Sequence, residues 1–285
     1  MIEITPEMQA HMDEQTRLIE ERLFGDKVDL AGFRANIGFP PYNEIVHKGW
    51  RLEYKPDQPH KGYFNGMCVM NVDGGNPILS EDATSAWMGV TAREVESHVP
   101  HARFVQMTDH ICVMGLGMGY FLYLATINYA ERITVYERDP AVIELFYMIT
   151  EGISDWDDTL ENLEIRQLDV LSDGWHDDEY YDHCYVDIWQ SMNPESTIPD
   201  MQHIAARMLN CQDFSFWCQE MAFTEWAIAG AKDKGTTPDE MVWDSDLWDQ
   251  FADDCNFPMA LPFWNFDRDW YVRLAKKATE RAYFD

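Results

Sequence analysis

The sequence predicts an α/β fold: one mostly parallel sheet with helices on both faces, a β-containing N-terminal extension and a helical C-terminal segment. Three observations predict it. From residue 110 onward apolar runs recur at regular intervals, segments with a helical pattern separate most of them, and a glycine-rich turn follows the first run. Strands that alternate with helices form βαβ units, and these units build parallel sheets.

The N-terminal extension is expected over residues 1–105. Apolar residues recur at helical spacing near its start and again near its end, and Gly, Pro and aromatic residues are frequent between these two segments. The elements predicted here are a helix over 5–24, strands at Trp50–Tyr54 and Met67–Val72, and a helix over 83–98 that Pro100 closes.

The sheet is expected in residues 106–230, and several of its strands are apolar nearly throughout, as a sheet covered on both faces requires. The predicted strands are His110–Met114, Arg132–Glu137, Leu163–Asp169, His183–Ile188 and Phe214–Cys218. The predicted helices between them are Tyr120–Tyr129, Pro140–Thr150 and Met201–Leu209. In the C-terminal segment, residues 231–285, we predict helices at Met241–Phe251 and Asp267–Arg281.

One uncharged run has the length of a membrane span. Ile111–Ala130 contains 20 residues without a charge, which is enough to cross a bilayer as a helix. Its glycines, Gly115, Gly117 and Gly119, fall within five residues of one another. This clustering favours a buried strand, a turn and a helix over a single spanning helix.

Charge excludes two classes of partner. The chain of 285 residues has 51 Asp and Glu against 21 Lys and Arg, a formal net charge of −30. Such a surface opposes both nucleic acid and anionic membranes. Acid is concentrated in residues 151–182, with 12 Asp or Glu, and in residues 239–254, with 7. We favour a solvated acidic face; the alternative is steering of a cationic substrate or a basic partner toward the sheet.

Cysteine and histidine usage bounds the location and the metal chemistry. The six cysteines include no Cys-x-x-Cys pair, and the first residues lack a cationic segment followed by an apolar one. A reducing, cytoplasmic location is therefore expected. His98 and His101 flank Pro100 and could suggest a metal, but we expect no further ligand at helical spacing, so no metal site is predicted and packing or capping roles are expected.

A glycine turn follows the first predicted strand of the sheet. Gly115, Gly117 and Gly119 stand between this strand and a predicted helix, where the backbone can approach a ligand closely. A dinucleotide fingerprint, G-x-G-x-x-G, would need its third glycine at position 120, which is Tyr120. The spacing G-x-G-x-G therefore disfavours a dinucleotide and a dehydrogenase.

Three acids follow the next strands of the sheet. Glu137 ends the second strand, 22 residues beyond Gly115, and Asp169 and Asp187 end the third and fourth. A carboxylate at the end of the second strand can accept hydrogen bonds from both hydroxyls of a ribose. Because the carboxyl ends of parallel strands meet at one edge, we expect the three acids to lie beside the glycine turn.

This constellation resembles the class I S-adenosylmethionine-dependent methyltransferases, whose fold is Rossmann-like. The resemblance covers roughly residues 108–220. It implies S-adenosylmethionine as the cofactor, with its amino acid part against the three glycines. It further implies that Glu137 holds the ribose and that Asp169 binds the adenine amine.

Within that superfamily the chain is similar to spermidine synthase-like proteins. Residues 94–100, EVESHVP, are similar to that family's E-x-x-x-H-P lead-in, and residues 137–142, ERDPAV, resemble its E-x-D-x-x-V run. Residues 181–187, YDHCYVD, are similar to the strand at which the family keeps its catalytic aspartate. The family's two amine-binding acids are replaced here by Met118 and Gln190, which disfavours authentic spermidine synthesis.

The expected function is methyl transfer from S-adenosylmethionine to a small-molecule acceptor, with a cationic acceptor the first to test. Asp187 is the candidate catalytic residue, as a base or as a group that orients the acceptor; contact with the cofactor and a structural role in its loop stay open alternatives. Two other functions also stay open: aminopropyl transfer, and a non-catalytic nucleotide-binding protein that acts through its acidic surface. The sequence leaves open whether the chain forms a homo-oligomer.

Overall fold

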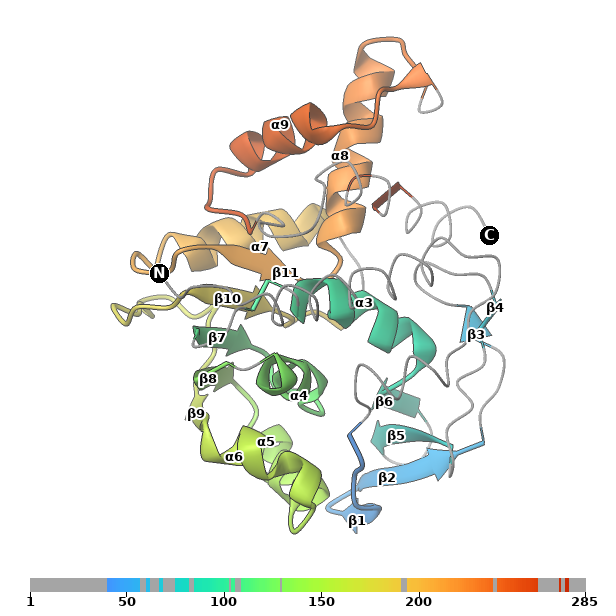
Figure 1. Cartoon of the computed structure of the whole chain (residues 1–285), viewed down its shortest axis with the longest axis vertical. Coiled ribbons are helices and arrows are strands. Elements are labelled where there is room, and N and C mark those ends of the chain that lie inside the picture. The colour runs from blue at the N-terminus through green and yellow to red at the C-terminus, as the bar shows by residue number, and fades with distance from the viewer. Residues whose placement is uncertain are drawn as a thin grey trace, which may run out of the picture.

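The computed structural model describes most of the chain between residues 40 and 260 (Figure 1). Within that range the residues left undescribed are 57–59, 62–66, 69–74, 82–84, 103, 106–108, 129, 191–193 and 238–239. Beyond it Val272, Ala275 and Lys276 are described and are helical. The helix expected over 5–24 lies outside the described residues. So does the helix expected over Asp267–Arg281, apart from the three residues just named.

Five parallel strands form the central sheet, which confirms the predicted fold class. They are β7 (His110–Met114), β8 (Arg132–Glu137), β9 (Leu163–Gln167), β10 (His183–Val186) and β11 (Phe214–Phe216). Their spatial order is β11-β10-β7-β8-β9, and every neighbouring pair is parallel. The chain leaves β7 toward β8 on one side and returns later to β10 on the other. Ligands of open α/β sheets bind at such a reversal, beyond the carboxyl ends of the strands.

Helices flank this sheet. They are α3 (Ala92–Ala102), α4 (Tyr120–Ile127), α5 (Pro140–Thr150), α6 (Asp157–Glu161), α7 (Pro194–Ala205), α8 (Gln219–Asp233) and α9 (Ser245–Cys255), with a short 3₁₀ turn at Ser154–Trp156. Figure 1 shows α7, α8 and α9 beside the β10–β11 half and α5 and α6 beside the β8–β9 half. Asp139 caps α5 by accepting from the Ala141 amide at 2.8 Å, and Pro140 takes the first helical position.

A second, antiparallel sheet precedes the parallel one. It consists of β1 (Ile45–His47), β2 (Trp50–Lys55), β5 (Asn76–Glu81) and β6 (Ser85–Gly89), in the order β1-β2-β5-β6. A two-stranded ribbon of β3 (His60–Lys61) and β4 (Met67–Cys68) accompanies it, so only the first two residues of the strand expected at Met67–Val72 are described. Hydrogen bonds from Asn43 to Ile149, at 2.8 Å, and from Trp156 to Pro41, at 2.8 Å, join this region to the α/β part.

Several predicted boundaries are wrong. The helix expected over 83–98 is instead strand β6 followed by α3, because Ser85–Gly89 pairs with β5 and this pairing overrides the local pattern. Pro100 lies inside α3, which continues to Ala102. Other predicted elements have shifted ends: β2 continues to Lys55, β9, β10 and β11 finish two residues early, α4 ends at Ile127, α7 covers Pro194–Ala205, and α9 covers Ser245–Cys255. The sequence pattern did not predict β1, β3, β5, α6 or α8.

The uncharged run Ile111–Ala130 is the predicted strand, turn and helix, β7 and α4. In the part of the chain that the structure describes, no helix combines the length and the apolar character that crossing a membrane requires. The described cysteines, from Cys112 to Cys255, are buried free thiols.

Candidate functional site

The glycine turn lies where β7 ends, and its backbone adopts a conformation that favours glycine. Gly115, Gly117 and Gly119 have φ angles of +92°, +51° and +76°. A Cβ atom on Gly115 would lie 2.0 Å from the carbonyl oxygen of Asp187, and one on Gly119 would lie 2.3 Å from the Phe146 ring. These two glycines therefore allow close packing within the protein.

Gly117 differs because a flexible side chain from the antiparallel sheet lies against it. A Cβ atom on Gly117 would lie 2.6 Å from Cε of Met88, a β6 residue. The amide of Met118 donates a hydrogen bond to the Met88 sulfur at 3.1 Å. The cavity between β6 and the turn measures about 30 Å³, and Met88 is what fills the space over Gly117.

Glu137 is fastened to the turn by both carboxylate oxygens. Its Oε2 accepts from the Leu116 amide at 3.0 Å, and its Oε1 accepts from the Asp139 amide at 2.8 Å. The predicted contact between this acid and the turn therefore exists. Each oxygen keeps a second lone pair, so a ribose hydroxyl could still donate to it.

Asp169 lies beyond β9 rather than in it. Its side chain is exposed, and its Oδ1 accepts from the Leu171 amide at 3.0 Å, within its own loop. This contact is a local turn of the kind that Asp favours, and it leaves the second oxygen available to a ligand.

Asp187 follows β10 directly and lies across the reversal point from the turn. Its amide donates to the carbonyl of Met114 at 2.8 Å, which places it at the end of β7. Its Oδ2 lies 3.2 Å from Nε2 of His98, a residue of α3. The side chain of Asp187 is 18% exposed and that of His98 is 5% exposed, so the pair is largely removed from water.

A second carboxylate stands beside this pair. Glu94 precedes His98 by one helical turn, and its Oε1 lies 3.8 Å from His98 Nδ1. Burial opposes the protonation of His98, but the hydrogen bond to Asp187 and the charges of Glu94 and Asp187 outweigh it and raise its pKa to about 9. Burial raises the pKa of Glu94, the His98 charge opposes this, and the Asp187 charge adds to it.

Aromatic rings enclose the same cavity. Tyr185 of β10 shares a strand face with Asp187, and its ring stacks on Phe121 with centroids 3.8 Å apart. The Tyr185 hydroxyl is buried and finds no hydrogen-bond partner among the described residues. Burying such a group unpaired costs about 1–3 kcal/mol, which points to a ligand or water at this position.

Sequence reasoning missed four of the residues that line this cavity: Met88, Glu94, His98 and Tyr185. Met88 and Tyr185 carried no local signal. Glu94 and His98 did, because they stand four residues apart in a segment predicted to be helical, which places both on one face. The packing or capping role predicted for His98 does not include its contacts with Glu94 and Asp187.

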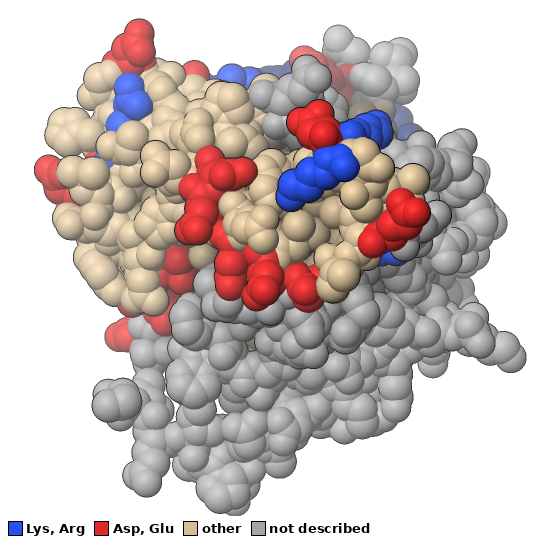
Figure 2. Space-filling model, turned by 90° about the horizontal axis from the view of Figure 1, so that it is seen from above, with Lys and Arg blue, Asp and Glu red and all other residues tan. Residues whose placement is uncertain are grey.

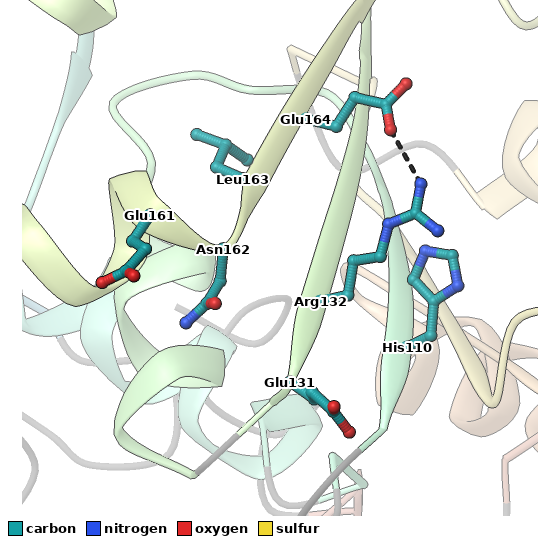
Figure 3. A pocket seen from close by; sticks show the side chains of 7 residues that line it. All are labelled: His110, Glu131, Arg132, Glu161, Asn162, Leu163 and Glu164. Atoms are coloured by element: carbon teal, nitrogen blue, oxygen red, sulfur yellow. Dashed lines mark hydrogen bonds and ion pairs between the residues drawn. The ribbon is translucent and has the colours of Figure 1, made fainter.

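A larger hollow lies at the opposite edge of the sheet (Figure 3). It measures about 460 Å³ and is lined by the starts of β7, β8 and β9 and the end of α6: His110, Glu131, Arg132, Glu161, Asn162, Leu163 and Glu164. Arg132 and Glu164 pair across it at 2.9 Å. Four of its lining side chains are charged, and it lies at the amino ends of the strands, whereas ligands of open α/β sheets bind beyond the carboxyl ends, so we do not place the site there.

Part of the acidic surplus is internally paired. Arg166 contacts Glu164 and Glu179, both at 2.7 Å, and all three belong to the acidic segment 151–182. Figure 2 shows one face of the molecule, on which acidic side chains of the described residues are spread among uncharged ones with a few Lys and Arg between them. This distribution agrees with a solvated acidic surface.

Comparison with known proteins gives partial likenesses. No family model and no curated protein matches the chain. Among solved structures, an S-adenosylmethionine dependent methyltransferase from Mesorhizobium loti is 15% identical, with 41% of this chain and 51% of that chain covered and a TM-score of 0.30. A dimethyladenosine transferase from Plasmodium falciparum is 15% identical, with coverages of 49% and 46% and a TM-score of 0.34.

A third similar structure contains a product of methyl transfer. It is phosphoethanolamine N-methyltransferase 1 from Haemonchus contortus with phosphoethanolamine and S-adenosylhomocysteine, 15% identical, with 41% of this chain and 24% of that chain covered and a TM-score of 0.29. In all three cases the alignment spans less than two thirds of the compared chain.

The residues at the carboxyl edge suit S-adenosylmethionine in kind. They offer a turn with positive φ angles, a carboxylate clamped beside it at Glu137, and an orphaned hydroxyl at Tyr185. The cavity of about 30 Å³ is far smaller than the several hundred Å³ of typical small-molecule sites. Among the described residues, only the flexible end of Met88 stands over Gly117, so a change of its rotamer enlarges the space without moving the backbone.

Proposed function

We propose that this chain is an S-adenosylmethionine-dependent transferase that moves a methyl group to a small-molecule acceptor. One observation carries the proposal. The G-x-G-x-G turn follows β7, where the order of the parallel sheet β9-β8-β7-β10-β11 reverses, and it is hydrogen-bonded to the Glu137 carboxylate at the end of the neighbouring strand β8. A turn and a carboxylate so placed suit a ligand that combines a ribose with an amino acid part.

The chain's own residues would hold the cofactor and keep water away. Gly117 is the position at which the backbone meets the cofactor's amino acid part, Glu137 accepts from the ribose, and Asp169 accepts from the adenine amine. The sulfonium of S-adenosylmethionine is itself the activated donor, so the protein must supply alignment and the exclusion of water. Asp187 lies on the acceptor side and orients the nucleophile, and the rings of Tyr185 and Phe121 close the cavity behind it.

Calorimetry with S-adenosylmethionine and S-adenosylhomocysteine tests this proposal. We expect both to bind below millimolar concentration, and Glu137→Gln to weaken binding roughly tenfold or more, because a charge-assisted hydrogen bond is worth about 1.5–3 kcal/mol. Glu164→Gln, which removes the same charge from an exposed β9 position, should leave the affinity unchanged. The absence of binding at millimolar concentration would refute the proposed function.

The resemblance to spermidine synthase-like proteins raises a finer question, which is whether the chain transfers a methyl or an aminopropyl group. Met118 is buried inside the turn, and Gln190 is exposed beyond Asp187, so neither position offers a carboxylate for an amine. We therefore favour methyl over aminopropyl transfer. Incubation with decarboxylated S-adenosylmethionine and putrescine discriminates the two, since only an aminopropyl transferase would release methylthioadenosine.

A further inference from the structure

The cluster of Glu94, His98 and Asp187 is more than a pair of hydrogen bonds. Helix α3 sets Glu94 and His98 one turn apart, and the end of β10 brings Asp187 to the same point from 89 residues away. Each residue offers one ligand atom, and these three atoms lie within 4.8 Å of one another. Ligand atoms bound to one metal ion at about 2.0–2.3 Å lie roughly 3–4.5 Å apart, so the cluster needs only a small contraction to hold an ion.

Contacts of Nδ1 fix the orientation of the His98 ring. Its Nδ1 lies 2.9 Å from the carbonyl oxygen of Glu94, which can only accept, so this nitrogen carries a hydrogen. Ser97 Oγ lies 3.2 Å from the same nitrogen and in turn accepts from the indole of Trp217 at 3.1 Å. Metal-ligating histidines are held in this way, with one nitrogen donating to a carbonyl and the other free to bind.

The remaining nitrogen, Nε2, is directed at the Asp187 carboxylate. Two lone pairs at 3.2 Å repel unless a cation stands between them, so the pair must share either a proton or a metal ion. With a proton, two carboxylates and one imidazolium leave a charge of −1 in a poorly hydrated cavity. A divalent ion with neutral imidazole balances the same three groups completely.

An independent observation points to a ligand in the same cavity. Tyr185 lines it, and its hydroxyl is buried and without a hydrogen-bond partner among the described residues. A water bound to a metal ion at the cluster would supply the missing hydrogen bond.

We propose that Glu94, His98 and Asp187 bind a divalent first-row metal ion, of the class of Mn²⁺ or Zn²⁺. One imidazole and two carboxylates suit these ions, and three protein ligands leave further coordination positions open toward the cavity. The ion's role rests on the proposed function: at the acceptor side of the glycine turn it would bind an oxygen of the acceptor and hold it in place. This differs from direct binding of a cationic amine by Asp187.

Mn²⁺ binding to the full chain without cofactor tests the site. The loss of the free-ion resonance signal is titrated, and one ion per chain should displace the proton shared by His98 and Asp187 and bind more tightly than about 1 mM. Glu94→Gln and His98→Gln should each weaken binding at least roughly tenfold. Glu144→Gln and His110→Gln remove the same residue types from positions outside the cluster and should bind as the unchanged protein does.

If His98→Gln does not fold, thermal unfolding of the unchanged protein and of Glu94→Gln still tests the site. Mn²⁺ should raise the Tm of the unchanged protein and leave that of Glu94→Gln, whose side chain is 24% exposed, unaltered. Absence of Mn²⁺ and Zn²⁺ binding up to about 1 mM, or equal weakening in the two control variants, would overturn the proposal. Because no cofactor is present, failure here is distinguishable from a failure of S-adenosylmethionine to bind.

Discussion

Two histidine–carboxylate clusters lie at opposite edges of the parallel sheet and have different surroundings. At the carboxyl edge, His98 meets Asp187 and faces a cavity beside the glycine turn. At the amino edge, His183 of β10 lies 2.5 Å from the Asp213 carboxylate through Nδ1 and 2.9 Å from Ser215 Oγ through Nε2. The second cluster has the composition and connectivity of a Ser-His-Asp hydrolytic triad.

The surroundings, rather than the residue types, separate the two. Ser215 is completely buried in β11 and His183 is 2% exposed, and neither lines a described cavity. Both nitrogens of His183 are satisfied, and no substrate could reach Ser215. His98 by contrast borders the cavity beside the glycine turn and has a second carboxylate, that of Glu94, next to it. A buried cluster whose hydrogen-bonding groups are all paired stabilises the fold. A cluster that has an additional carboxylate and borders a cavity can bind a ligand.

The largest expected effect is a loss of stability when the packing at the carboxyl edge of the sheet is disrupted. Gly115→Ala puts a Cβ atom 2.0 Å from the Asp187 carbonyl at φ +92°, so the ends of β7 and β10 must separate. We expect a loss of about 4 kcal/mol or more in the free energy of unfolding, measured by urea denaturation. Gly174→Ala is the matched control, because at φ +85° it meets nothing within 4 Å and should cost only about 1–2 kcal/mol of backbone strain. Equal losses in both variants would contradict the close approach of the two strands.

The next prediction tests whether the His183 cluster contributes to stability alone, in contrast to the His98 cluster beside the cavity. His183→Asn leaves the Asp213 carboxylate and the buried Ser215 hydroxyl without their partner, which we expect to cost about 2–4 kcal/mol of stability. Cofactor affinity, measured by calorimetry below the unfolding temperature, should stay within about twofold of the unchanged protein. A folded His183→Asn protein that no longer binds cofactor would show that the amino-edge cluster belongs to the site.

A smaller effect concerns the side chain that narrows the cavity. Met88→Ala removes the thioether from above Gly117 and frees the Met118 amide, so a ligand no longer has to displace it. We expect S-adenosylhomocysteine to bind up to about tenfold more tightly, equivalent to about 1.4 kcal/mol. Met208→Ala removes a buried methionine that follows α7 and does not line the cavity, and it should lower stability without changing the affinity. Weaker binding in Met88→Ala would mean that Met88 packs on the cofactor instead of competing with it.

Local patterns predicted the carboxyl edge well because its parts are short-range. The strand, the G-x-G-x-G turn and Glu137 are encoded within 27 residues, from Ile111 to Glu137, and the structure joins Glu137 to the turn as expected. The cap of α5 by Asp139 is equally local, since the residues that it joins are two apart. The assigned ligand contacts of Gly117, Glu137 and Asp169 stay predictions.

The remaining features depend on contacts between distant segments. Met88 reaches Gly117 from β6, a strand that the sequence pattern presented as a helix because its partner β5 was not recognised. His98 meets Asp187 across 89 residues, and Ser215 meets His183 across 32. Spacing along the chain contains no information on such pairs. Only the Glu94 and His98 pair could have been found, since helical spacing places the two side chains together.

The smallest effect lies at the exposed rim of the amino edge. Hydrogen bonds from Arg166 and then Arg132 lower the pKa of Glu164 to about 2. A depressed pKa stabilises the fold above the carboxyl's unfolded pKa of about 4.3, and this contribution disappears as the pH falls toward 2. Since Glu164 is 46% exposed, solvent screening limits it to about 1 kcal/mol or less. Glu164→Gln should therefore lower the free energy of unfolding slightly at pH 7, by less as the pH is lowered toward 3, and by almost nothing at pH 7 in about 1 M salt. A loss that persists in high salt would mean that this rim is held by buried contacts, as the His183 cluster is, and not by surface charge.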